Sequence, residues 1–264
     1  MNESIPGPQP RWRTVDSLDV AVFENGTALA RFAARAAAEC LRAAIEKQGT
    51  AAVIFATGNS QLEFLRALAL EPGVNWGAVT AFHMDEYLGL PAGHPAAFRR
   101  YIHEKIGQIL HPARVHYLEG DALEPAAECD RYSGLLTAQP IDLCCLGIGE
   151  NGHLAFNDPP VAHFEDARKV NIVALDQACR LQQVGEGHFP NLDTVPSYAL
   201  TLTIPMLCSA RRMICIAPEA RKARAVRDAL TGPISTTCPA SYLRSQPQAV
   251  LLLDPDSAAA WLRT

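Results

Sequence analysis

The sequence predicts an α/β fold: a single Rossmann-like domain with a mainly parallel sheet and helices on both faces. Short apolar runs that suit buried strands alternate along the chain with longer segments whose composition favours helix. A chain of 264 residues is long enough to fill the core of such a domain. We expect strands at 19–23, 51–56, 78–82, 115–118, 141–146, 212–217 and 249–253, and helices at 29–47, 60–70, 95–110, 121–138 and 219–230.

The individual elements rest on local composition. The strand at 141–146 is the most apolar run, and the helix at 29–47 is rich in Ala, Leu and Arg, which have high helix propensity. Residues 158–195 interrupt the rhythm and contain Pro159-Pro160, Gly185 and Gly187. We expect this long segment to be an active-site lid or loop.

Domain organisation and charge exclude several classes of protein. We expect residues 1–15 to be an N-terminal tail and residues 16–264 to be the domain. The tail is polar and Pro-rich, unlike a signal peptide, and no other stretch is apolar over a membrane-spanning length. A net charge of −5 argues against a nucleic-acid surface, although a local pocket can still hold a small anion.

The chain contains eight cysteines, several of them inside apolar runs and none in a CxxC pair. We therefore expect reduced, buried thiols in a cytoplasmic protein.

The turn Thr57-Gly58-Asn59-Ser60-Gln61 follows the expected strand at 51–56. Gly58 allows a tight turn, and Ser60 and Glu63 have the spacing of a capping box. Free amides and hydroxyls at a helix start favour an anion such as a phosphate monoester. A capped helix start without a ligand is the competing interpretation.

Two adjacent acids, Asp85 and Glu86, follow the expected strand at 78–82, beside apolar Met84 and Tyr87. A partly desolvated carboxyl there would have a raised pKa and could act as a base, while the other carboxyl would be structural. A solvated acidic turn is the alternative.

The richest motif runs from Gly147 to Asp158, after the strand at 141–146. Its glycines allow the backbone to approach a ligand closely. Asp158 lies five residues after His153, so that the two can meet across a turn and the carboxylate can orient the imidazole. We hypothesise that His153 is catalytic.

Two cofactor interpretations of this region are weaker. Gly147, Gly149 and Gly152 match the dinucleotide fingerprint, but the fingerprint normally opens the first strand–helix unit and here it lies in mid-chain. A metal held by Asp85, His153 and Asp158 lacks support from a helix-spaced His pair or a CxxC pair. We expect neither a cofactor nor a metal.

Three segments together resemble the glucosamine-6-phosphate deaminase family, which is related to 6-phosphogluconolactonase. They are Met84-Asp-Glu-Tyr87, Gly149-Glu-Asn-Gly-His-Leu-Ala-Phe-Asn-Asp-Pro159 and Val195-Pro-Ser-Tyr-Ala-Leu-Thr201, in the family's order. The resemblance runs from about Phe23 to the C-terminus. His94-Pro95 with Phe98, and Lys222 at the start of Lys-Ala-Arg-Ala225, fit the same pattern.

The resemblance implies a Rossmann-like enzyme without a cofactor, commonly a homo-oligomer, that converts glucosamine 6-phosphate to fructose 6-phosphate and ammonia. Such a reaction places it among hydrolases of amino sugar metabolism. By the family's pattern, Asp85 moves the proton between C2 and C1, and His153 opens the sugar ring with Asp158 and Asn151. The implied substrate-binding residues are Thr57, Gly58, Asn59, Ser60, Glu86, Gly149, Gly152 and Lys222.

The chain also departs from the family's pattern. Asn151 stands where family members often have Asp, and Asp158 stands where they have Glu. The family's phosphate-clamping arginine has no clear match, and Arg180 or His188 are the candidates to replace it. Residues 159–163 replace the Ser-rich loop that binds an allosteric sugar phosphate in some members, so we expect no such allostery.

Three rival functions remain. A 6-phosphogluconolactonase typically has Asp-Glu-Arg and Asp-Gly-His where this chain has Asp85-Glu86-Tyr87 and Asn151-Gly152-His153, which favours the deaminase. A sugar-phosphate isomerase would stop before deamination. A non-catalytic sugar-phosphate sensor would lose the acids, whereas this chain retains Asp85 and His153.

Overall fold

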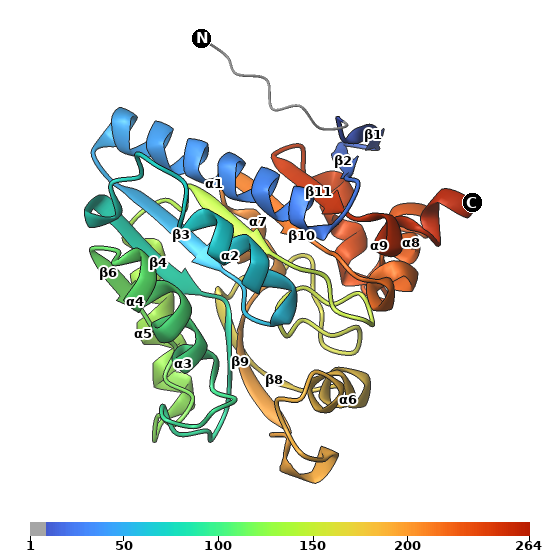
Figure 1. Ribbon diagram of the computed structural model, residues 1–264. Coiled ribbons are helices and arrows are strands. Elements are labelled where there is room, and N and C mark those ends of the chain that lie inside the picture. Colours follow the sequence, from blue (N-terminus) through green and yellow to red (C-terminus); the bar gives the residue numbers. More distant parts are fainter. Residues whose placement is uncertain (1–8) are drawn as a thin grey trace.

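The computed structural model describes residues 9–264 and has the expected α/β architecture (Figure 1). Eight strands form the main sheet in the order β1-β2-β11-β10-β7-β3-β4-β6. β1 pairs antiparallel with β2, and the other neighbouring pairs are parallel. The strands are β1 (Arg11–Val15), β2 (Leu18–Val22), β3 (Ala51–Phe55), β4 (Val79–His83), β6 (Arg114–His116), β7 (Leu143–Leu146), β10 (Arg212–Ile216) and β11 (Ala249–Leu253).

Helices cover both faces of this sheet, which confirms the expected fold class. One face packs against α1, α2 and the segment 98–110, and the other packs against α5, α7 and α8. The helices are α1 (Gly26–Gln48), α2 (Leu62–Leu68), α3 (Phe98–Ile102), α4 (Gln108–Leu110), α5 (Pro125–Thr137), α6 (Gln177–Gly185), α7 (Ile204–Cys208), α8 (Ala223–Thr231) and α9 (Pro255–Ala258). A π-helical turn, His103–Gly107, joins α3 to α4.

The apolar run in β3 shows why a central parallel strand needs no polar face. Val53 and Phe55 pack on the side of α1 and α2, whereas Ile54 packs into the opposite cluster. All three are fully buried, because side chains alternate between two covered faces.

A second, antiparallel sheet contains β5 (Asp85–Tyr87), β9 (Tyr198–Leu202) and β8 (Val170–Ala174). It corrects two expectations. Asp85 and Glu86 lie in a strand instead of a turn, because Asp85 pairs with Thr201, more than a hundred residues along the chain. The segment 158–195 is not an irregular lid throughout, since it contains β8 and α6.

The N-terminal boundary also differs from the expectation. Arg11–Val15 form the edge strand β1, so the expected tail of residues 1–15 is wrong for these five residues. Their pairing with β2 supplies the hydrogen bonds that an isolated tail would lack. Residues 1–8 of that tail lie outside the described residues.

Burial of the cysteines is confirmed for five of the eight, whereas Cys40, Cys208 and Cys238 are half-buried. Within residues 9–264, the structure contains no helix long and apolar enough to cross a membrane.

The connections place a crevice at the carboxyl ends of the strands in the main sheet. From β3 the chain proceeds to β4 and β6 on one side, and from β7 it proceeds to β10 and β11 on the other. β3 and β7 are neighbours, so the loops that leave their carboxyl ends diverge. Such a switch point is where open parallel sheets bind ligands.

Candidate active site

The expected site residues gather at this switch point. One cavity is lined by residues that follow four adjacent strands, β4, β3, β7 and β10. The expected residues in its lining are Thr57, Gly58, Ser60, Asp85, Gly149, His153 and Lys222. Residues from three separate motifs therefore face a single space.

The turn after β3 forms one end of the cavity. Gly58 has a φ of +99°, which a side chain would strain, and its carbonyl accepts hydrogen bonds from the Gln61 amide (3.1 Å) and the Tyr101 hydroxyl (3.1 Å). The expected capping box is wrong, because Glu63 instead accepts a hydrogen bond from Thr27 Oγ1 at 2.6 Å. The Ser60 side chain is thus not used as a cap and lines the cavity.

Lys222 supplies a buried cation at the same end. It ends a short 3-10 turn, Ala220–Lys222, before α8, and only 3% of its surface is exposed. Burial lowers its pKa, and the neighbouring Arg221 adds to this effect. Nearby Glu186 partly opposes this shift, but Lys222 makes no ion pair within residues 9–264, so the cavity next to this buried ammonium favours an anionic ligand.

Asp85 lies in the cavity wall at the start of β5 and is 6% exposed. Burial, and secondarily the charge of Glu86, raise its pKa well above the usual value. Its Oδ1 has no hydrogen-bond partner within the described part of the chain. A carboxyl in this state can exchange a proton with a ligand more readily than a solvated aspartate can.

Glu86 joins β5 to the start of α3. Its carboxylate accepts hydrogen bonds from the amides of Phe98 (3.0 Å) and Arg99 (2.7 Å) at the start of α3, and from that of Tyr87 (2.8 Å). It is not among the residues that line the cavity, and its assignment to substrate binding stays a prediction. Burial raises its pKa to about 7, although these amides oppose the shift.

His153 lines the cavity and is paired with the Asp158 carboxylate, as expected. Its Nδ1 lies 2.9 Å from Oδ1 of the fully buried Asp158. Asp158 also accepts hydrogen bonds from the Asn151 side chain (3.0 Å) and the Asp176 amide (3.1 Å). Burial alone would raise the pKa of Asp158, but the imidazole and these donors lower it, so the carboxylate is ionised beside the histidine.

Asn151 supports this pair without lining the cavity. Its Oδ1 accepts the His153 amide at 3.2 Å while its Nδ2 donates to Asp158. The amide therefore ties the two ends of the motif together, which explains how Asn can stand where the family often has Asp. The shorter Asp158 still reaches the imidazole in this chain.

The glycines of the motif are needed for space and for backbone conformation. A Cβ on Gly149 would lie 2.2 Å from the His153 ring, so only glycine leaves room for the imidazole. Gly152 has a φ of +86°, and a Cβ there would lie 2.8 Å from Cys238 Sγ. Glycine suits this turn, but Gly152 is not among the residues that line the cavity, and its assignment to substrate binding stays a prediction.

Among the described residues, one group has metal-ligand chemistry: His153, Asp158 and Cys179, whose ligand atoms lie within 4.8 Å of one another. Burial and the nearby carboxylates raise the pKa of Cys179 well above 9. A metal would have to displace the thiol proton, which weakens binding near neutral pH. The thiol is buried beside His153 and Asp158.

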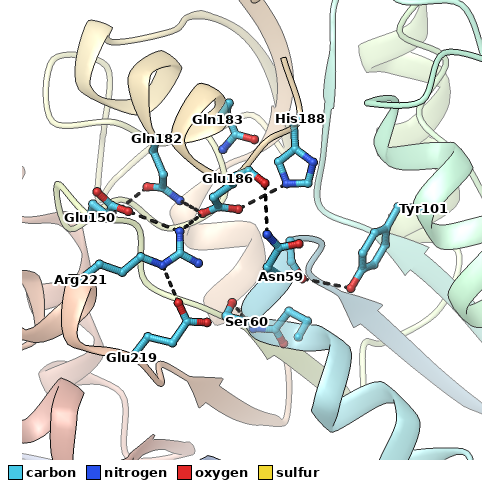
Figure 2. A network of polar contacts seen from close by, with 12 residues as sticks. Asn59, Ser60, Tyr101, Glu150, Gln182, Gln183, Glu186, His188, Glu219 and Arg221 are labelled. Atoms are coloured by element: carbon cyan, nitrogen blue, oxygen red, sulfur yellow. Dashed lines mark hydrogen bonds and ion pairs between the residues drawn. The ribbon is translucent and has the colours of Figure 1, made fainter. Parts of the chain in front are cut away.

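α6 contributes residues that sequence reasoning missed. Gln182, Gln183 and Glu186 line the cavity from one face of this helix and its end (Figure 2). Glu186 follows Gln183 by three residues and Gln182 by four, which is a helical spacing, but the glycines at 185 and 187 suggested a loop. Tyr87 fixes Gln183 through a 2.7 Å hydrogen bond from its hydroxyl.

Neither candidate for the missing arginine faces the cavity as a free cation. Arg180 donates to the carbonyls of Leu192 (2.8 Å) and Val195 (2.9 Å), and His188 lies 3.4 Å from the Glu186 carboxylate. Asn59 is not among the residues that line the cavity, and its Nδ2 donates to the Glu186 carbonyl at 3.4 Å (Figure 2). Its assignment to substrate binding stays a prediction.

Known proteins match most of the chain. Residues 24–252 match the family described as glucosamine-6-phosphate isomerases/6-phosphogluconolactonase. A glucosamine-6-phosphate deaminase of Pseudarthrobacter chlorophenolicus is 34% identical over 248 residues, which is 92% of each chain. One from Listeria innocua is 31% identical over 77% of this chain and 85% of the relative.

Solved structures give the same result. A monomeric glucosamine-6-phosphate deaminase superposes with a TM-score of 0.82 at 29% identity, over 91% of this chain and 99% of the other. A 6-phosphogluconolactonase of Shewanella baltica has a TM-score of 0.74 at 18% identity, over 92% and 98%, and shows the fold alone. The chain therefore belongs to the glucosamine-6-phosphate isomerase/6-phosphogluconolactonase family of enzymes.

Proposed function

We propose that this chain is an isomerising deaminase that converts glucosamine 6-phosphate to fructose 6-phosphate and ammonia. One observation carries the proposal: Asp85 and His153 line the same cavity as the Thr57–Ser60 turn and Lys222. An amino sugar anchored by its phosphate at the turn would extend toward the carboxyl and the imidazole. The relatives with this activity match most of the chain, whereas the lactonases are distant.

Ring opening would be the first step. The imidazole of His153 takes the proton of the anomeric hydroxyl and returns a proton to the ring oxygen, so the C1–O5 bond breaks and an aldehyde forms at C1. Asp158 stabilises the imidazolium in between, because its ionised carboxylate lies 2.9 Å from Nδ1. Because Gly149 has no side chain, the His153 imidazole has space beside it.

Proton transfer between carbons would follow. The Asp85 carboxylate takes the proton from C2 while the carbonyl oxygen gains one from water, which gives a 1,2-enaminol. The protonated carboxyl then returns its proton to C1 as the nitrogen lone pair forms the C2=N bond, and the hydroxide left from that water takes an N–H proton, which leaves an imine at C2. Burial raises the pKa of Asp85, which makes a carboxylate a stronger base and suits it to this transfer.

Hydrolysis would complete the reaction. Water adds to C2 of the imine, the C2–N bond breaks and ammonia leaves. The product is the ketose, with its carbonyl group at C2. The phosphate takes no part in bond changes, and it fixes the orientation of C1 and C2 relative to the two catalytic groups.

An ammonia-coupled assay tests the proposal. Purified protein is incubated with glucosamine 6-phosphate, and in parallel with 6-phosphogluconolactone and with unphosphorylated glucosamine. We expect ammonia and fructose 6-phosphate from the first substrate and far slower turnover of the others. Lactone hydrolysis without ammonia release would overturn the proposal, and ketose formation without ammonia would show an isomerase.

Assembly and location remain proposals. The resemblance implied a homo-oligomer, while the solved deaminase with the TM-score of 0.82 is described as monomeric. Light scattering after size exclusion would decide, since the mass of one chain would contradict an oligomer. We retain a cytoplasmic location as a prediction, which fractionation of the source cells would test.

A further inference from the structure

A second cation adjoins the buried Lys222. Arg221 precedes it in the same 3-10 turn, and three carboxylates surround its guanidinium (Figure 2). Nε contacts Glu219 at 2.6 Å, and Nη1 contacts Glu186 at 2.5 Å and Glu150 at 3.4 Å. These contacts fix the plane of the guanidinium group.

The third nitrogen of Arg221 remains available. Nη2 takes part in none of the hydrogen bonds made within residues 9–264. In Figure 2 it points toward the side of the site where Asn59 and Ser60 lie. A guanidinium held at two corners can thus offer its third corner to an anion at the Thr57–Ser60 turn.

Glu186 is the contact that brings Arg221 to the cavity wall. Its side chain is 6% exposed and lines the cavity, and a Cβ on Gly58 would lie 3.9 Å from its Oε2. Burial would raise its pKa, but His188, Arg221 and other donors lower it to about 2. The carboxylate is therefore ionised and can anchor the arginine at any working pH.

The charge balance permits a phosphate despite the carboxylates. Lys222, Glu186 and Asp85 line the cavity, and Arg221 contacts Glu186 from outside this lining. Because the raised pKa of Asp85 favours its neutral form, the two cations there stand against one lining carboxylate. Glu150 and Glu219 are 39% and 46% exposed, so water screens their repulsion. Arg221 can therefore still attract an anion in the cavity.

We propose that Arg221 is a second phosphate-binding cation beside Lys222, and that Glu186 is the positioning residue that sets it against the cavity. Arg221 would supply the guanidinium contact for which Arg180 and His188 are not placed. The inference rests on the proposed function only in taking phosphate as the anion at the turn.

Calorimetric titration with inorganic phosphate tests the proposal without catalysis. Arg221→Gln should raise the Kd for phosphate roughly 10-fold to 100-fold, the range expected for one charge-assisted hydrogen bond. Arg224→Gln is the matched control, because Arg224 lies on α8 with 84% of its side chain exposed and makes the same charge change. Circular dichroism and Tm establish that each variant is folded. An unchanged Kd in Arg221→Gln would overturn the proposal.

A double-mutant cycle tests the positioning role of Glu186. Glu186→Gln should raise the Kd for phosphate several-fold in the wild-type background and leave it unchanged in the Arg221→Gln background. A purely repulsive carboxylate would give the opposite sign, because its removal would tighten phosphate binding, and that result would overturn the positioning role.

The two proposals can fail separately. Phosphate binding that depends on Arg221 in a protein that releases no ammonia would contradict only the deaminase function. Ammonia release with a phosphate Kd unaffected by Arg221→Gln would contradict only the role of Arg221.

Discussion

Substituting Gly149 by alanine would test whether the position of the His153 imidazole is essential. The added Cβ would lie 2.2 Å from Cε1 and Nε2 of the ring and 2.4 Å from Cδ2, distances that real contacts do not reach. The backbone cannot easily yield, because the Gly149 amide donates to the His153 carbonyl at 2.9 Å and the Gly149 carbonyl accepts from Gly152 at 3.0 Å. The imidazole must therefore rotate away from Asp158.

Loss of a positioned acid–base group lowers kcat by about 10²-fold to 10⁴-fold, or about 3–5 kcal/mol of activation free energy. The steric cost to folding is smaller, about 1–3 kcal/mol. We thus expect Gly149→Ala to stay folded, to bind inorganic phosphate as the wild type does, and to lose nearly all ammonia release from glucosamine 6-phosphate.

Steady-state kinetics at saturating substrate, with Tm measured by calorimetry, would separate the two effects. Gly134→Ala is the control, because Gly134 lies exposed in α5 and a Cβ there meets no described atom within 4 Å. A Gly149→Ala variant that retains kcat within threefold of the wild type would refute the reasoning.

Three further predictions concern the site and its support. Asp158→Asn should lower kcat about 10²-fold to 10⁴-fold with little change in phosphate affinity, because His153 loses its ionised partner. Ammonia release sampled at fixed times would measure kcat, and an unchanged kcat would contradict the prediction. The folded-state pKa of Glu86 is raised from 4.5 to about 7, so the folded chain binds more protons between these values and stability falls as pH rises through this window. Relative to Glu86→Gln, the wild type should lose about 3 kcal/mol of unfolding free energy from pH 4.5 to pH 7, because the pKa rises by about 2.5 and each pKa unit corresponds to about 1.36 kcal/mol. Urea unfolding at both pH values measures this loss. An equal change in the unfolding free energy of wild type and variant would contradict it. Tyr132→Phe should cost about 1–3 kcal/mol in the same assay, because the Tyr132 hydroxyl accepts the buried His83 amide at 3.1 Å, and wild-type stability would contradict that role.

The main sheet could be predicted because its strands are buried on both faces. Runs such as 51–55 and 249–253 are apolar throughout, and a parallel sheet between two helical layers is the arrangement that buries them. The turns after these strands could be predicted as the site for the same reason, since parallel strands end at one edge. Thr57, Asp85 and His153 therefore meet as expected.

The antiparallel sheet could not be predicted from local pattern. β5 has three residues, two of them acidic, and its pairing with β9 becomes visible only in three dimensions. The orientation of Glu86 depends on that pairing and on the start of α3. Arg221 was missed because a charged residue next to a lysine that the resemblance already assigns to the substrate has no distinguishing sequence feature.

A crystal structure of the Asp85→Asn variant with glucosamine 6-phosphate bound would test the central claim most directly. The account predicts the phosphate against the Thr57–Ser60 turn and Lys222, with C1 and C2 next to position 85 and the ring oxygen next to His153. A sugar bound with its reacting carbons away from position 85, or with its phosphate in another cavity, would contradict the account.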